Sequence, residues 1–154
     1  MPDALPQAPQ LDRLLALLGP RGLLTEPADL APHLTDWRGL YRGAALAVAR
    51  PADAAEVAAV VRLCAETNTP ITIQGGNTSM VGGAVPDESG RHLILSLARL
   101  NRIRDLDPVD MTMTAEAGVV LKAAQHAAAA AGCLFPLSLG AAGTATIGGV
   151  LSTN

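Results

Sequence analysis

The fold is decided by residues 45–79, with the sequence ALAVARPADAAEVAAVVRLCAETNTPITIQGGNTS. This stretch begins with a short apolar segment at 45–49 and reaches a β-branched segment at 71–74, each with the length and composition of a buried strand. A helical pattern lies between them. Strand, helix and strand in about thirty residues make a βαβ unit, so we predict two parallel strands and an α/β fold.

The central helix carries start and stop signals. Asp53 and Glu56 have the D-x-x-E spacing of a capping box, which satisfies backbone N–H groups at a helix N-terminus. Asn68 followed by Pro70 predicts its end. Its buried face is predicted to consist of four apolar residues: Val57, Val60, Val61 and Cys64.

The residues before this unit have weaker patterns. Leucines at positions i, i+3, i+4 and i+7 predict a helix over 10–18. A second short helix is predicted to start at Pro27, and residues 33–43 are predicted to be a connecting loop.

Three further strands are predicted downstream. Residues 92–97 have the composition of a buried strand, and 100–106 and 111–117 are predicted to pair as antiparallel strands. In the last of these, apolar and polar residues alternate, which is typical of a strand with one buried face. We therefore expect a small βαβ subdomain over 45–74, joined to a second, mixed sheet from residue 92 onward.

The C-terminal part contains a predicted helix and a predicted loop. The helix follows Gly118, runs through Ala131, consists mostly of alanine and is closed by Gly132. Residues 133–154 are rich in glycine and are predicted to be a loop.

Composition excludes several classes of protein. A formal net charge of −3, with 16% charged residues, argues against nucleic-acid binding, which normally requires a basic patch. Residues 123–154 carry no Asp, Glu, Lys or Arg, but glycine and proline interrupt them, so we predict no membrane span. The start of the chain lacks a secretory pattern, and Cys64 and Cys133 are interpreted as buried free thiols. A cytoplasmic location is therefore predicted.

Signals of catalysis and metal binding are missing. His33, His92 and His126 lie far apart and lack the spacing of metal ligands, so no metal site is predicted. No G-x-S-x-G, Walker A or G-x-G-x-x-G pattern is present. We therefore assign no catalytic residue to this chain.

Two uncharged, glycine-rich stretches carry the positive signal, at 75–79 (GGNTS) and 140–149 (GAAGTATIGG). Successive backbone N–H groups in such a loop form a concave nest for anionic oxygen, and glycine lets the backbone approach a ligand closely. These stretches suit a pyrophosphate or a flat ring, whereas the alternative is that they are only tight turns. If they form a nest, a side chain introduced by Gly76→Val is expected to fill it and abolish binding.

Six motifs occur in the order and spacing of a known family. They are Asp36-Trp37, Arg50-Pro51 through Val57, PITIQGGNTSMVGGAVP at 70–86, Ile94-Leu95-Ser96 with Leu100-Asn101-Arg102, Glu116-Ala117-Gly118, and PLSLGAAGTATIGGVLSTN from Pro136. On these motifs, residues 36–154 resemble the FAD-binding (PCMH-type) domain of the vanillyl-alcohol-oxidase flavoprotein superfamily. Within it they are similar to the branch of D-2-hydroxyglutarate dehydrogenase, D-lactate dehydrogenase and glycolate oxidase. The resemblance leaves residues 1–35 as an N-terminal helical lead-in.

The resemblance implies an FAD site made by both glycine-rich stretches. Members that attach FAD covalently often carry His at the position of Asn77, so the resemblance implies non-covalent FAD. The residues it places around the cofactor are Gly75, Gly76, Asn77, Thr78, Ser79, Gly82 and Gly83 on one side, and Pro136, Leu137, Gly140, Gly143, Thr144, Thr146, Gly148 and Gly149 on the other. Gly118 would close the loop ahead of the helix that follows it.

The resemblance also implies an activity, which is oxidation of a small 2-hydroxy acid by hydride transfer to flavin and onward transfer of electrons to an unidentified acceptor. Family members continue past the equivalent of Asn154 into a substrate domain that supplies metal-binding histidines and an arginine. The chain is therefore expected to be an N-terminal fragment, with its FAD domain incomplete at the C-terminus, that is inactive alone. Ser138 and Ala142 stand where close relatives carry Asp and Lys, so the particular hydroxy acid stays open.

Three alternatives stay open. The chain could be a stand-alone, non-catalytic flavin-binding module or partner subunit. It could belong to an enzyme of the same fold with other chemistry, such as a sugar or aromatic-alcohol oxidase or the flavin subunit of a molybdenum hydroxylase. It could also be a structural protein that has lost the cofactor. FAD binding and the downstream sequence discriminate among these.

Overall fold

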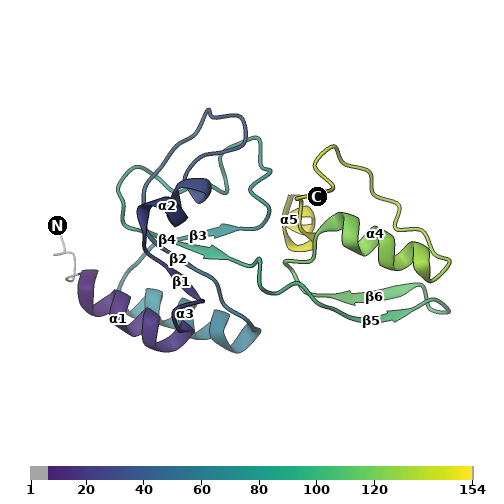
Figure 1. Cartoon of the computed structure of the whole chain (residues 1–154), viewed down its shortest axis with the longest axis horizontal. Helices are drawn as coiled ribbons and strands as arrows, with labels where there is room; N and C mark the ends of the chain where they lie inside the picture. Colours follow the sequence, from purple (N-terminus) through teal and green to yellow (C-terminus); the bar gives the residue numbers. More distant parts are fainter. Residues whose placement is uncertain (1–6, 154) are drawn as a thin grey trace.

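Two sheets, each with helices beside it, lie next to each other in the computed structural model, which describes residues 7–153 (Figure 1). Residues 1–6, at the start of the predicted lead-in, and Asn154 lie outside the described part. The elements are α1 (Gln7–Leu18), β1 (Leu23–Leu24), α2 (Pro27–Leu30), the 3-10 helix η1 (Ala31–His33), β2 (Ala45–Ala49), α3 (Ala54–Glu66), β3 (Ile71–Gln74), β4 (His92–Ser96), β5 (Ile103–Asp107), β6 (Thr112–Ala115), α4 (Leu121–Ala130) and α5 (Ile147–Thr153).

The first sheet has the strand order β1-β2-β4-β3. Strands β2 and β3 both run parallel to β4, as the βαβ pattern predicts, while β1 pairs antiparallel with β2. The prediction that residue 92 opens a second, mixed sheet is wrong for β4, which lies between β2 and β3. The reason is burial on both faces, since Leu93, Ile94 and Leu95 are all at most 2% exposed and only a central strand hides such a run.

Two clusters of apolar side chains cover the two faces of this sheet. On one face, Leu14 and Leu18 of α1 and Val60 of α3 pack with alternate residues of β2 and β4. On the other face, Leu30 of α2 packs with Val48 and Ile94. The N-terminal segment therefore shares the core of the first sheet.

Helix α3 begins and ends as its sequence predicts. The Asp53 carboxylate accepts a hydrogen bond from Glu56 N (2.9 Å), and the Glu56 carboxylate accepts one from Ala52 N (2.7 Å). At the other end Asn68 adopts a positive φ of 49°, and Thr69 N donates to Cys64 O (2.8 Å), which is the geometry of a Schellman cap.

The buried face of α3 differs from the prediction at one position. Val60 and Cys64 are buried, but Val61 is 44% exposed and Leu63 is buried instead. Val61 lies about 100° around the helix from Val60 and so points away from the sheet.

The second sheet consists of β5 and β6, which pair antiparallel as predicted, with Leu106 opposite Met113. It contains only these two strands within residues 7–153, so it is antiparallel rather than mixed. Helix α4 lies beside it (Figure 1) and buries Leu121, Ala124 and Ala128.

Helix α5 is the main departure from the predicted loop at 133–154. A Gly-Gly pair disfavours a helix, but contacts from distant residues stabilise this one. Ile147 N donates to Val119 O and Gly148 N to Ala117 O, both at 2.8 Å. These bonds satisfy two N–H groups of the first turn that have no acceptor inside the helix.

Candidate functional site

The two glycine-rich stretches predicted from the sequence lie against each other. The first follows β3 at the carboxyl edge of the parallel strands, and the second leads into α5. A Cβ atom added to Gly75 would overlap Thr146 Oγ1, and one added to Gly76 would overlap the carbonyl oxygen of Thr144 and lie 3.2 Å from Ala145 Cα. The backbones therefore approach at a distance that only glycine allows at positions 75 and 76.

This contact changes the reason for expecting harm from a side chain at Gly76. The sequence argument places that side chain in an anion-binding nest. The structure directs its Cβ toward the backbone of the second loop instead. A substitution at Gly76 would thus separate the loops.

Two buried polar atoms at this contact have no partner within the described residues, Asn77 Oδ1 and Thr146 Oγ1. The amide nitrogen of Asn77 does have one, because it donates to Thr35 O (2.9 Å). Buried polar atoms are nearly always hydrogen-bonded in folded proteins. An unpaired acceptor and an unpaired hydroxyl, one from each loop, are therefore typical of a place where a polar ligand binds.

Backbone donors are available at the same place. Between residues 7 and 153, the N–H groups of residues 75–80 donate to no acceptor. Asn77 has a positive φ of 51°, which turns the chain within the loop. Residues 75–79 are half-buried, and successive free N–H groups of this kind form the nest that binds anionic oxygen.

The predicted glycines fall into two groups. Gly118 and Gly148, like Gly75 and Gly76, would place a Cβ against neighbouring atoms, and Gly82 has a φ of +75° and lies against the Tyr41 ring. By contrast, Gly83, Gly140 and Gly143 have nothing within 4 Å of an added Cβ. Packing within residues 7–153 explains the first group but not the second.

The remaining predicted residues differ in position. Thr78 and Ser79 continue the first loop, and Ser79 Oγ accepts from Val81 N (3.3 Å). Gly149, in α5, lies 3.4 Å from Thr146 Oγ1, measured from an added Cβ. Pro136 and Leu137 are held beside α4, where Gln125 Nε2 donates to Leu137 O (2.6 Å).

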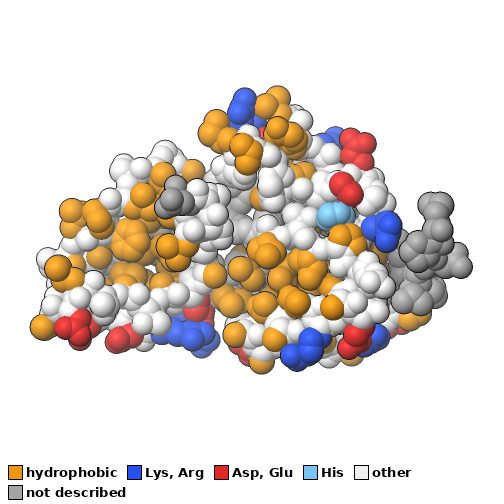
Figure 2. All heavy atoms as spheres, turned by 180° about the vertical axis from the view of Figure 1, so that it is seen from behind, with side chains coloured by type: hydrophobic (Ala, Val, Ile, Leu, Met, Phe, Trp, Pro, Cys, Tyr) orange, Lys and Arg blue, Asp and Glu red, His pale blue; other side chains and the backbone are white. Residues whose placement is uncertain are grey.

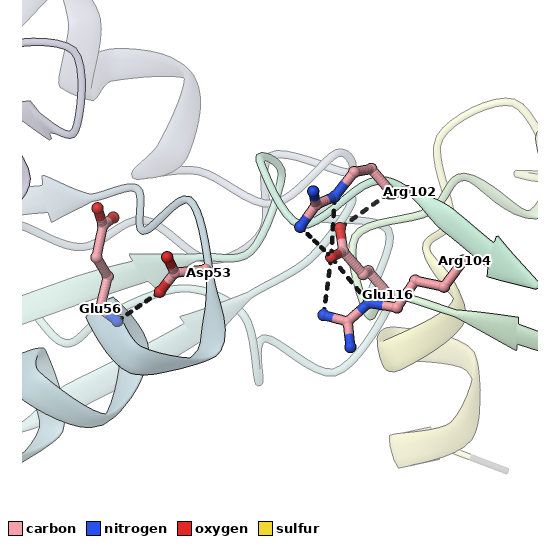
Figure 3. A network of polar contacts seen from close by, with 5 residues as sticks. All are labelled: Asp53, Glu56, Arg102, Arg104 and Glu116. Atoms are coloured by element: carbon pink, nitrogen blue, oxygen red, sulfur yellow. Dashed lines mark hydrogen bonds and ion pairs between the residues drawn. The ribbon is translucent and has the colours of Figure 1, made fainter.

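Glu116, at the end of the stretch in which the sequence alternates apolar and polar residues, is the centre of an ion-pair cluster (Figure 3). Its side chain is 2% exposed, and Oε1 accepts hydrogen bonds from the guanidinium groups of Arg102 (2.9 and 3.2 Å) and Arg104 (2.9 and 3.2 Å). Oε2 accepts from Arg102 N (2.9 Å). Hydrogen bonds from the Arg102 side chain, then from its backbone and from Arg104, lower the pKa of Glu116 to about 2. The cluster joins the start of β5 to the end of β6.

We expect this cluster to make stability depend on pH. Because the pKa of Glu116 falls from 4.5 unfolded to about 2 folded, its stabilisation is complete above pH 4.5 and is lost as the pH falls toward 2. Glu116→Gln should lower the melting temperature at pH 7 and flatten the loss of stability between about pH 4.5 and 2. Thermal unfolding followed by circular dichroism across this range measures both effects.

Glu66→Gln is the matched control for this prediction. Glu66 forms a surface ion pair with Arg13 in which both side chains are more than half exposed, and such pairs contribute little. Parallel pH profiles for wild type and Glu116→Gln would contradict the proposed role of the cluster.

Two hollows lie away from the glycine loops. One, of about 570 Å³, is at the amino end of β3 and β4 and is lined in part by Pro70 and His92. The other, of about 320 Å³, is lined by Leu24 and three arginines, Arg21, Arg50 and Arg99. Neither of these two hollows is lined by a residue of the glycine loops.

Large apolar side chains are exposed around both sheets. Trp37 and Val81 lie on loops of the part that contains the first sheet, and Met111 and Leu134 lie in the part that contains the second. Each is more than half exposed. Figure 2 shows hydrophobic side chains across the back of the molecule, with many charged ones near its lower edge. A large contiguous apolar patch is typical of a surface that contacts further protein or a ligand, whereas apolar side chains exposed singly are common. No helix between residues 7 and 153 is long and apolar enough to cross a membrane.

Comparisons with known proteins agree with this geometry. The model of a family described as "FAD binding domain" matches residues 45–154. D-2-hydroxyglutarate dehydrogenase of Xanthomonas citri pv. viticola is 40% identical over 132 residues, which cover 86% of this chain and 28% of the relative. The mitochondrial D-2-hydroxyglutarate dehydrogenase of Bos taurus is 39% identical over 137 residues, covering 88% and 24%. The chain thus spans about a quarter of the length of these relatives.

Solved structures have the same fold. An alkyldihydroxyacetonephosphate synthase superposes with a TM-score of 0.85 at 19% identity, covering 99% of this chain and 30% of that one. A p-cresol methylhydroxylase superposes with a TM-score of 0.70 at 25% identity, covering 80% and 24%. The prediction of a PCMH-type α/β fold is confirmed.

Proposed function

Because the chain belongs to the family of FAD-binding domains, we propose that its two glycine-rich loops, at 75–83 and 136–149, together form a cradle that holds FAD. The observation that carries this proposal is the contact between Gly75-Gly76 and residues 144–146, where Asn77 Oδ1 and Thr146 Oγ1 are buried and have no partner among residues 7–153. The proposed contacts are the residues predicted from the sequence, from Gly75 to Gly83 in the first loop and from Pro136 to Gly149 in the second, with Gly118 behind them.

The residues present suit this cofactor. The N–H groups of residues 75–80 can donate to the pyrophosphate, the Thr146 hydroxyl can donate to a phosphate oxygen, and Asn77 Oδ1 can accept from a sugar hydroxyl. No charged side chain occurs in either loop. Neutral donors would therefore stabilise the negative charge of the pyrophosphate by hydrogen bonds, as in other backbone nests.

We propose that FAD is bound non-covalently. Asn77 stands where covalently flavinylated members of the family often carry His. Its amide is not a nucleophile, and its nitrogen already donates to Thr35 O.

For the full-length protein we propose oxidation of a small 2-hydroxy acid. Relatives with this domain are named D-2-hydroxyglutarate dehydrogenase and D-lactate dehydrogenase. FAD supplies the acceptor for the hydride of the substrate. A substrate domain C-terminal to this chain would bind the hydroxy acid, and the exposed apolar surface described above would contact it. The electron acceptor is unassigned.

The test is to purify the full-length protein and measure its flavin and its activity. We expect a yellow protein that releases FAD on acid precipitation and reduces an artificial dye with D-2-hydroxyglutarate, D-lactate or glycolate. A purified protein without flavin would refute the proposal that the two loops hold FAD. Flavin that stays in the precipitate would refute non-covalent binding. Bound FAD without hydroxy-acid turnover would refute only the activity.

A cytoplasmic location also stays a proposal, supported by the buried free thiol of Cys64. The relatives from Bos taurus and Schizosaccharomyces pombe are named as mitochondrial. Cell fractionation with an antibody against the protein would distinguish the two.

A further inference from the structure

The side chain of Gln74 is the most constrained polar group beside the first glycine loop. Gln74 is the last residue of β3 and is 1% exposed. Its Nε2 donates to His33 O (3.0 Å) and to Ala84 O (2.8 Å), and its Oε1 contacts His33 Nδ1 at 2.5 Å. One buried amide thus joins three segments of the chain.

The surroundings allow only one orientation of this amide. Both partners of Nε2 are carbonyl oxygens, which only accept, so the nitrogen has to face them. Oε1 then accepts from His33 Nδ1, so this ring nitrogen is the one that carries a hydrogen. All three contacts are satisfied together, so the amide holds its partners in a single arrangement.

These bonds hold together the two ends of the glycine loop, at Gln74 and Ala84, which we call its neck. The loop leaves β3 directly after Gln74, passes Gly75 to Gly83, and returns to Ala84, whose carbonyl is bound by the same Gln74 side chain. Figure 1 shows this loop beside the segment that follows η1. Asn77 Nδ2 binds Thr35 O in that segment, only two residues from His33.

We propose that Gln74, together with His33, is a positioning residue that presents the first glycine loop to the pyrophosphate of FAD. This inference rests on the proposed function. Gln74 does not touch the cofactor. It holds the two ends of the loop at a fixed separation. Residues 33–35 contact the loop from outside, and they precede the part of the chain at 45–154 that matches the family model. Residues 33–35, at the end of the predicted lead-in, thereby help to position the cofactor loop.

The test compares two buried glutamines in the full-length protein. Gln74→Met keeps the size of the side chain but removes all three hydrogen bonds. Gln10→Met is the matched control, because Gln10 is also buried and its Nε2 donates to Thr67 Oγ1 (3.2 Å) and Thr69 Oγ1 (2.5 Å), before β3 rather than after it. His33→Ala removes a single bond and serves if Gln74→Met does not fold.

Three measurements are made on each protein: the dissociation constant of FAD by flavin fluorescence, the melting temperature of the apoprotein, and the rate of thermolysin cleavage within residues 80–85. We expect Gln74→Met to raise the FAD dissociation constant at least tenfold and His33→Ala to raise it severalfold. Both should speed cleavage of the loop. Gln10→Met should change FAD affinity less than twofold, even if its melting temperature falls as far as that of Gln74→Met.

The outcomes separate the two proposals. If wild type binds FAD and Gln74→Met weakens binding no more than Gln10→Met, the positioning role of Gln74 is overturned while the cradle stands. If wild type binds no FAD, the cradle itself is overturned, and with it any role of Gln74 in FAD binding. Cleavage of the loop that is no faster in Gln74→Met would overturn the neck closure without reference to FAD.

Discussion

Replacing Gly76 with alanine is expected to raise the dissociation constant of FAD by about 100-fold, equivalent to about 2.8 kcal/mol. The added methyl group would overlap the carbonyl oxygen of Thr144 and lie 2.7 Å from its carbonyl carbon. Backbone atoms on both sides cannot rotate away as a side chain can, and overpacking of this kind costs about 1–3 kcal/mol or more. The loops would move apart, and Asn77 and Thr146 would no longer face one ligand.

Gly143→Ala is the control that separates packing from ligand approach. No atom of the described residues 7–153 lies within 4 Å of a Cβ at Gly143, so the melting temperature of the apoprotein should be unchanged. If position 143 is a glycine because FAD approaches its backbone closely, Gly143→Ala should still weaken FAD binding. Gly76→Ala should lower both the melting temperature of the apoprotein and its affinity for FAD.

Flavin fluorescence titration and thermal unfolding of the apoprotein measure the two effects in the full-length protein. Gly76→Ala with wild-type FAD affinity would show that contact between the loops is not needed for binding. If Gly143→Ala binds FAD with unchanged affinity, FAD does not approach the second loop at Gly143, and this position is not part of the proposed cradle.

Local signals predicted much of the fold because they depend on neighbouring residues. The bounds of β2 and β3 match the predicted 45–49 and 71–74, and α3 starts after the predicted cap. The position of β4 could not be predicted in this way, since it depends on which elements bury Leu93 and Ile94 from opposite sides. Helix α5 was missed for a similar reason, because distant residues 117 and 119 accept the bonds of its first turn.

The sequence identified the two loops of the site but not the contact between them. Glycine and small polar residues identified both loops, whereas their contact joins Gly76 to Thr144 across a long separation in sequence. Gln74 and Glu116 were missed as organising residues. The partner of Gln74 on η1 lies 41 residues upstream, and the arginines of Glu116 come from the opposite strand. A buried polar residue next to a glycine motif is the signal that could have indicated Gln74.

Gly118→Ala is expected to destabilise the protein by about 3 kcal/mol or more, at the upper end of overpacking effects. Gly118 lies where the chain passes from β6 toward α4, and its N–H donates to Leu100 O (2.8 Å). An added Cβ would overlap Leu97 O and lie 2.7 Å from Leu100 O. Residues 97–102 connect β4 to β5, so the substitution strains the junction between the two sheets.

The expected damage extends to the second glycine loop. Ala117 and Val119, on either side of Gly118, accept the bonds that start α5, and a Cβ on Gly148 would already lie 2.8 Å from Ala117 Cβ. Any shift at Gly118 therefore moves the segment that carries Thr146.

Urea unfolding of the full-length protein without FAD measures the loss, with Gly132→Ala as the control. Gly132 has a φ of +75°, but in the described part of the chain nothing lies within 4 Å of an added Cβ, so its substitution should cost only the conformational strain, about 1 kcal/mol. If Gly118→Ala costs no more than Gly132→Ala, the junction is soft enough to accept a side chain. The two sheets would then be free to shift relative to each other, and the alignment of the loops would have to come from FAD rather than from the packing of the chain.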